Sequence, residues 1–236
     1  FVATPGQPPL EIFATGTGTA INDAGQVVGY SAVNKAFRYT PGEGVQILGS
    51  VGTHDLNFAW AINAAGDVVG EAVESNSVHY EPIPFLYTAA GGMQEIGDFG
   101  GYSVAVSVND ARQVVGTSAP PNLPPAAWLW SAQTGVTFLQ SLVAPAEHLN
   151  LLQAARINDA GQILAEATDN QTGDHFVVIL TPPVADAWTN LGFALAGGSG
   201  PPQLAGQGAL VPRAHVSLSL THALPNAPLL LVAGLS

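Results

Sequence analysis

A ten-residue pattern that recurs four times constrains the fold of this chain more than any other feature. Each copy has an apolar residue, an Asn, a short turn and two aliphatic residues. The copies span 20–29, 61–70, 107–116 and 156–165, and their Asn residues stand at positions 22, 63, 109 and 158. The repeat is therefore 41 to 49 residues long. Self-similarity at such a spacing indicates a repeat architecture, in which each repeat is one supersecondary unit.

Each copy is predicted to be a β-hairpin whose turn is formed by the Asn-Asp-Ala-Gly segment. An Asn side chain can bond the backbone two residues on, and Gly supplies the positive φ that a type I turn with a bulge requires. The predicted turn residues are Asn22, Asp23, Gly25, Asn63, Gly66, Asn109, Asp110, Asn158, Asp159 and Gly161. Arg112 stands where Gly is expected, so either it adopts the left-handed conformation at some cost or the turn changes type.

A second hairpin follows the first in three of the repeats. An aromatic strand, a Gly turn and an apolar strand occupy 36–49, 85–97 and 127–139, whereas the strand at 175–180 runs into Thr181-Pro182-Pro183 without a second turn. Two hairpins make four short antiparallel strands, the content of a propeller blade. The sequence predicts an all-β fold of four-stranded antiparallel repeats in a propeller-like arrangement of about four blades. An open stack of β-units is the alternative arrangement.

The repeats resemble the extracellular HAF repeat family. The resemblance rests on Ile-Asn, Gly and Val-Val-Gly, followed by an Ala-Phe-aromatic strand and Leu-Gly, and it covers about residues 15–180. The sequence departs from that pattern at Arg112, at Ala64 in place of Asp, and in the incomplete fourth unit. The resemblance implies a bacterial exported or surface protein, and it transfers no catalytic residues.

The character of the sequence changes near residue 184, which predicts a repeat domain at 1–183 and a C-terminal β segment at 184–236. In the latter, Val216, Leu218 and Leu220 alternate with polar residues, as in a half-buried strand. A second strand is expected at 229–232. The segment looks like the first half of a β-sandwich module of secreted bacterial proteins. A half module would leave an apolar sheet edge, which the repeats or another subunit could cover.

The N-terminal residues 7–14 are expected to form an extended strand. The apolar residues Leu10, Ile12 and Phe13 make this strand a candidate for donation to a neighbouring subunit, because strand addition builds stable polymers from incomplete sheets. Closure of the chain's own first blade is the alternative. Donation would make the protein a homo-oligomer or homopolymer.

Composition narrows the classes of partner. The chain has 17 acidic and 5 scattered basic residues, a net charge of −12, so it lacks the basic surface that nucleic acid or anionic lipid requires. Its longest apolar run, at 227–235, is too short for the roughly 20 residues that span a bilayer, so membrane insertion is not expected. A chain that begins at Phe1 is expected to be a secreted product whose leader was removed; an arbitrary start is the alternative.

The search for chemistry yields no enzyme site and no cofactor. Nucleophile-elbow, phosphate-loop and dinucleotide motifs are absent, and there are no cysteines. Each Asn-Asp-Ala-Gly turn supplies one carboxylate at most, whereas calcium takes six or more oxygens, so the turns are interpreted as structural and without metal. Strand aromatics such as Phe37 and Tyr39 are expected to pack in the core, with a glycan-stacking platform as the alternative.

The sequence thus predicts a non-enzymatic extracellular structural protein, a subunit of a surface filament or matrix assembled through β-strand contacts. A secreted carbohydrate- or protein-binding module is the alternative.

Overall fold

In a computed structural model, residues 11–97, 99, 101–143 and 147–182 are described in full, together with the backbone of 203–207 and 217–221. The chain divides into two compact units, Phe1–Thr181 and Pro182–Ser236. In the second, β16 (Gln203–Gln207) pairs antiparallel with β17 (Ser217–Thr221). The strand predicted around Leu218 is therefore confirmed, while Leu10 and the strand expected at 229–232 lie outside the described residues.

The first unit is built from four antiparallel sheets, one for each repeat, and within each sheet the strands neighbour one another in chain order. We number them sheets 1 to 4. They comprise β1 (Gly16–Ile21), β2 (Val27–Ser31), β3 (Ala36–Thr40) and β4 (Gly44–Ile47); β5 (Leu56–Ile62), β6 (Val68–Val73), β7 (Ile83–Thr88) and β8 (Gly92–Glu95); β9 (Tyr102–Val108), β10 (Val114–Ala119), β11 (Ala126–Ser131) and β12 (Gly135–Phe138); and β13 (Leu149–Ile157), β14 (Ile163–Asp169) and β15 (His175–Leu180). A 3-10 turn, Leu139–Leu142, lies between sheets 3 and 4. The predicted propeller-like all-β fold is confirmed.

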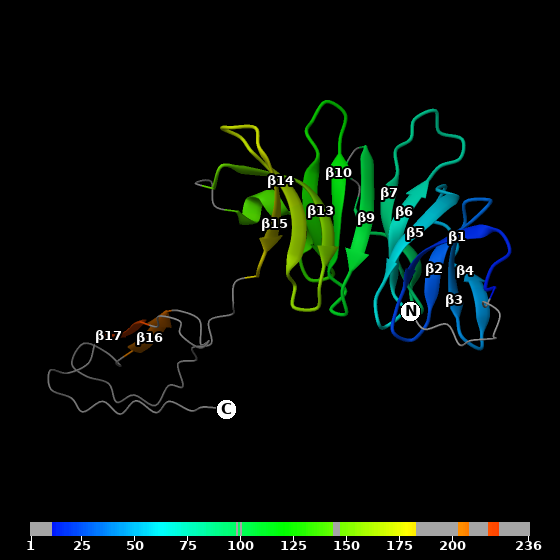
Figure 1. The fold of residues 1–236 in the computed structure, drawn as a ribbon, viewed down its shortest axis with the longest axis horizontal. Helices are drawn as coiled ribbons and strands as arrows, with labels where there is room; N and C mark the ends of the chain where they lie inside the picture. The colour runs from blue at the N-terminus through cyan, green and yellow to red at the C-terminus, as the bar shows by residue number, and fades with distance from the viewer. Residues whose placement is uncertain are drawn as a thin grey trace, which may run out of the picture. The chain divides into compact units, whose positions relative to one another are not determined.

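Consecutive sheets pack face to face, so that they follow one another in a row from β1 to β15 (Figure 1). We call the face that packs on the next sheet the forward face and the opposite one the backward face. Val28, Val69 and Val115 lie on forward faces, whereas Phe85 and Trp128 lie on backward faces, and all five side chains are fully buried. The second Val of each Val-Val pair, Phe85 and Trp128 therefore lie in the core between sheets, whereas Phe176 of β15, whose ring is also expected in the core, is 44% exposed.

The Gly of Val-Val-Gly is explained by a bulge in the first strand of each sheet. The pairing register shifts at the same place in β1, β5 and β9. A Cβ added to Gly29, Gly70 or Gly116 would lie within about 2 Å of a carbonyl oxygen on that strand, namely 1.8, 1.9 and 2.0 Å. These positions need Gly because the backbones approach so closely. In sheet 4, Ala165 takes this place, and β13 carries a second bulge.

Candidate functional site: the stacked turns

All four predicted turns form, and the four share one geometry. The N–H of the fourth residue bonds the Asn carbonyl, as in Gly25 to Asn22 at 2.9 Å and Arg112 to Asn109 at 3.0 Å. Gly25, Gly66 and Gly161 have φ of 74°, 81° and 75°, and Arg112 has 55°. Arg112 thus adopts the left-handed conformation and keeps the turn type.

The Asn side chain bonds further along the chain than expected. Each Asn Oδ1 accepts the backbone N–H four residues on, not two: Gln26 N donates to Asn22 at 3.0 Å and Gln113 N to Asn109 at 2.9 Å. The N–H three residues on is taken by the Asn carbonyl, as at Gly25. The Asn Nδ2 also donates to the side chain at the same position, as in Asn109 to Gln113 Oε1 at 2.8 Å.

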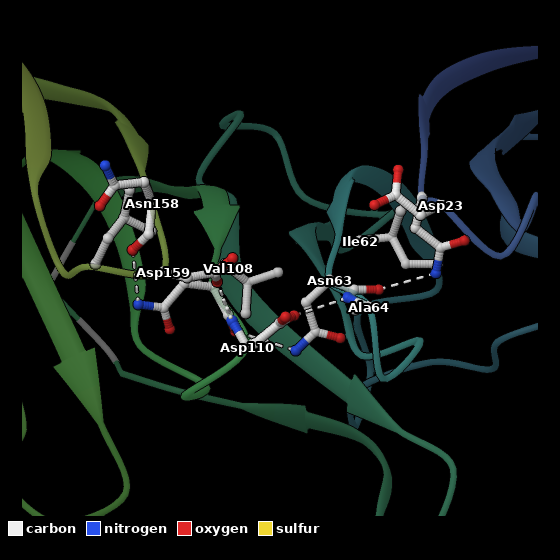
Figure 2. A pocket seen from close by; sticks show the side chains of 11 residues that line it. Asp23, Ile62, Asn63, Ala64, Val108, Asp110, Asn158 and Asp159 are labelled. Carbon is white, nitrogen blue, oxygen red and sulfur yellow. Dashed lines mark hydrogen bonds between the residues drawn. The ribbon is translucent and has the colours of Figure 1, made fainter.

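The same Asn amides link successive turns into a ladder. Asn22 Nδ2 donates to the carbonyl of Asn63 at 2.9 Å, Asn63 to Asn109 at 3.1 Å, and Asn109 to Asn158 at 3.0 Å. Figure 2 shows these turns side by side. Asn63 and Asn109 are buried, only 4% and 3% exposed, so their amide groups are satisfied inside the protein rather than by water.

The Asp residues of the turns make a second set of links, in which the carboxylate of the later turn accepts a backbone N–H of the earlier turn. Asp110 Oδ1 accepts the N–H of Ala64 at 2.9 Å, and Asp159 Oδ1 accepts the N–H of Asp110 at 2.9 Å. Every step between neighbouring turns therefore carries one bond from an Asn side chain, and these two steps also carry one bond to an Asp side chain. In both kinds of bond the donor belongs to the earlier turn. The first step, from turn 1 to turn 2, lacks the Asp bond because Ala64 stands in place of Asp.

Asp67 in the second turn and Arg112 in the third turn both depart from the common turn sequence, and the two departures compensate for each other. Asp67 replaces the Gln that the other turns carry four residues after Asn, and Arg112 replaces Gly. The Arg112 guanidinium contacts both oxygens of Asp67, with Nε–Oδ2 at 2.6 Å and Nη2–Oδ1 at 3.3 Å. The side chain of Asp67 is 3% exposed, so this bidentate pair neutralises a buried carboxylate. The contact with Asp67 raises the pKa of Arg112.

An open pocket of about 260 Å³ lies along the ladder. It is lined by the Asn and Asp or Ala of each turn and by the apolar residues before them, including Ile62, Val108 and Ile157 (Figure 2). Asp110 and Asp159 each use one carboxylate oxygen on a turn N–H. Within the described residues, no group of three or more His, Cys, Asp or Glu side chains is arranged to hold a metal ion.

The two ends of the ladder differ from its middle. Asn158 is exposed, and its Nδ2 donates only to Gln162 Oε1 at 2.9 Å among the described residues. At the other end, no described residue donates to the carboxylate of Asp23, which is also exposed. The forward donor of the last turn and the backward acceptor of the first turn are both left without the partner that the internal turns have.

Of the strand predicted at 7–14, residues 11–14 are described, and they form no strand, since β1 begins at Gly16; they contact their own chain instead. The Phe13 ring stacks on Phe37 of sheet 1, with centroids 4.8 Å apart, and Ile12 is half-buried. Phe99, which precedes sheet 3 as Phe13 precedes sheet 1, stacks in the same way on Trp128 at 5.1 Å. Strand exchange between subunits through this segment stays a prediction.

Sequence reasoning missed one buried carboxyl. Glu71 of β6 is 5% exposed; its Oε1 accepts from the hydroxyl of Tyr80 at 3.0 Å, and its Oε2 has no partner among the described residues. Burial raises the pKa of Glu71, and the Tyr80 hydrogen bond opposes this. Tyr80 and Tyr102, whose rings lie 6.2 Å apart, are both exposed. No motif marks this group, because its residues come from one strand, one loop and the next sheet.

Comparison with known proteins supplies no family. No family model matches the chain, and no curated protein matches it. Among solved structures, TolB from Acinetobacter baumannii is similar at 11% sequence identity and a TM-score of 0.42, over 70% of this chain and 43% of TolB. This chain thus spans less than half the length of that protein. The resemblance to HAF repeats stays a prediction.

Across the described residues, no helix is long and apolar enough to cross a membrane.

Proposed function

We propose that this chain is a non-enzymatic structural protein, a subunit of an extracellular filament or matrix that assembles through contacts between β-sheets. One observation carries the proposal. Leu164, Val177 and Ile179 on the forward face of sheet 4 are 37%, 73% and 66% exposed. They occupy the positions whose counterparts in sheets 1 to 3 face the next sheet.

The strand registers establish this correspondence. Leu164 pairs with Ile179 on β15 as Val69 pairs with Leu86 and as Val115 pairs with Leu129. Val69 and Leu86 are buried against sheet 3, and Val115 is buried against sheet 4. An exposed apolar face of this kind marks an interaction surface. A sheet that, among the described residues, has an exposed apolar face and no strand paired to the outer edge of β15 supports self-assembly rather than a monomeric role.

The proposal is tested by measuring the mass of the purified chain with light scattering over a range of concentrations, followed by negative-stain microscopy. We expect multiples of 24.1 kDa and regular polymers at high concentration. A chain that stays at 24.1 kDa at every concentration would contradict the structural role. The extracellular location rests on the resemblance to HAF repeats, and detection of the protein in the culture medium of its source would test it.

One observation favours the second candidate, a carbohydrate-binding module. Tyr80 and Tyr102 are 58% and 39% exposed and lie beside the buried carboxyl of Glu71. Exposed aromatic faces with a hydrogen-bonding group nearby are suited to a sugar ring, which has an apolar face and polar edges. A glycan array would test this: binding that Tyr102→Ala removes, while Val78→Ala leaves it unchanged, supports the candidate. Val78 is the control because it lies in the same loop as Tyr80 and is 92% exposed.

A further inference from the structure

We infer that copies of this chain associate head to tail, with the forward face of sheet 4 of one copy on the backward face of sheet 1 of the next. The inference rests on the proposed function and names the two surfaces that would carry it. Its template is the internal contact between consecutive sheets, which the chain builds three times.

The polar groups at the two ends of the ladder complement each other. In the internal steps, an Asn Nδ2 donates to the next Asn carbonyl, and a turn N–H donates to the next Asp Oδ1. Asn158 and the N–H of Asp159 are the donors that remain at one end. The carbonyl of Asn22 and the carboxylate of Asp23 are the acceptors at the other. A second copy placed one sheet further on would form both bonds as the step from sheet 3 to sheet 4 does.

The apolar groups show the same complementarity. Ile21 of sheet 1 is 69% exposed, whereas Val108 and Ile157, which hold the same place before the Asn, are 7% and 8% exposed because the preceding sheet covers them. Val177 of sheet 4 is 73% exposed, whereas its counterpart Ala127 is 1% exposed beneath the following sheet. Among the described residues, each of the two faces therefore lacks the cover that its neighbours have inside the chain.

The described part of the N-terminal segment, from residue 11 on, is compatible with this contact. Phe13 lies on the backward face of sheet 1 through its stacking on Phe37. Phe99 stacks on Trp128 in the corresponding position and belongs to the core between sheets 2 and 3, together with Leu86 and Ile96. An aromatic ring at this place is thus part of a sheet-to-sheet contact, and Phe13 would serve the contact between copies in the same way.

The two surfaces are different, so the association is heterologous and gives a closed ring or an open filament according to the rotation per copy. The net charge of −12 on each copy opposes it at low ionic strength, so added salt should strengthen it.

Disulfide trapping tests the arrangement, since the chain has no native cysteine. Asp159→Cys and Asp23→Cys are made in two chains of different mass and mixed under mild oxidation. Because Asp110 N–H donates to Asp159 across the internal step, Asp110→Cys with Asp159→Cys in one chain is the matched positive control. We expect a disulfide between the two different chains in the mixture, and little in either single variant alone.

A surface variant gives an independent readout. Ile179→Lys places a charge on the open face of sheet 4, and we expect it to weaken association at least about tenfold by light scattering. Val33→Lys is the control, because Val33 is 70% exposed and lies in the turn between β2 and β3. Equal effects of the two variants would overturn the inference.

The outcomes separate the inference from the proposed function. If the wild-type chain forms oligomers and the internal control closes, but the mixture gives no cross-link, the head-to-tail arrangement is wrong and self-assembly stands. If each single variant cross-links to itself as readily as in the mixture, the contact is symmetric and the arrangement is again wrong. A wild-type chain that is monomeric at all concentrations and salt levels overturns both.

Discussion

The Asn ladder can be tested by comparing one substitution at a middle turn and at the last turn. Asn109→Ala removes three side-chain hydrogen bonds, two within its turn and one to the carbonyl of Asn158. Asn158→Ala removes the two bonds within its turn, to the backbone and side chain of Gln162, and no bond to another turn among the described residues. Both turns carry Gln four residues after Asn, so the two sites are matched except for the ladder bond and burial.

The expected cost follows from the number and burial of the lost bonds. A buried hydrogen bond contributes about 1 kcal/mol net, and an orphaned buried partner adds about 1 to 3 kcal/mol. We expect Asn109→Ala to lower the free energy of unfolding by about 3 kcal/mol, since Asn109 is buried, and Asn158→Ala by about 1 kcal/mol, since water replaces its bonds. The difference of about 2 kcal/mol measures the ladder bond together with the burial that accompanies it.

Urea denaturation followed by tryptophan fluorescence is the assay. With a slope of about 2 kcal/mol per M, the two midpoints should differ by about 1 M. Both variants are made in the Ile179→Lys background, so that association between copies does not protect the last turn. Equal midpoints with equal slopes would refute the ladder as a source of stability and would leave each turn an independent hairpin.

Three further predictions concern the buried carboxyl, the Arg112 exchange and the close backbone approach. The pKa of Glu71 is raised in the folded protein, so its contribution to stability is complete below the ordinary value of 4.5 and is lost as the pH rises through the folded value. The Glu71→Gln variant should therefore be more stable than wild type at pH 7. Urea midpoints of the two proteins that differ equally at pH 4 and pH 7 would contradict this. Arg112→Gly should destabilise the protein because it leaves the buried carboxylate of Asp67 without its cation. Adding Asp67→Gln should then restore the melting temperature. Additive effects of the two substitutions in this double-mutant cycle would show that the two side chains are not coupled. Gly70→Ala should lower the free energy of unfolding by about 3 kcal/mol or more, since its Cβ would lie 1.9 Å from the carbonyl oxygen of Phe58. Gly42→Ala meets no atom within 4 Å and should lower it by only about 1 kcal/mol, for its positive φ. Similar thermal unfolding of the two variants would argue against the close approach.

The repeats made the local structure predictable. Asn and Gly at fixed offsets, followed by two aliphatic residues, specify a hairpin through short-range geometry, and the four turns form at the predicted residues. The left-handed conformation of Arg112 was one of two expected outcomes. The alternation of aromatics along β3, β7 and β11 predicted their place in the core, and Phe37, Phe85 and Trp128 are fully buried there.

The tertiary structure decided what the turn residues do beyond turning the chain. Sequence treated each Asn as bonded within its own hairpin, yet Asn63 also bonds Asn109, 46 residues away. A local pattern carries no information about which repeat lies next to which, so the ladder, the Asp67 to Arg112 pair and the Glu71 group appear only once the sheets are stacked.

The same stacking shows which faces stay open. Ile21 and Leu164 are aliphatic like their counterparts Val108 and Val115, and only the absence of a covering sheet among the described residues distinguishes them. The sequence by itself determined the repeating unit, because hairpins form through contacts between residues close in the chain. The packing of the units decided where the row ends and what lies exposed there, because burial depends on neighbours that no single repeat specifies.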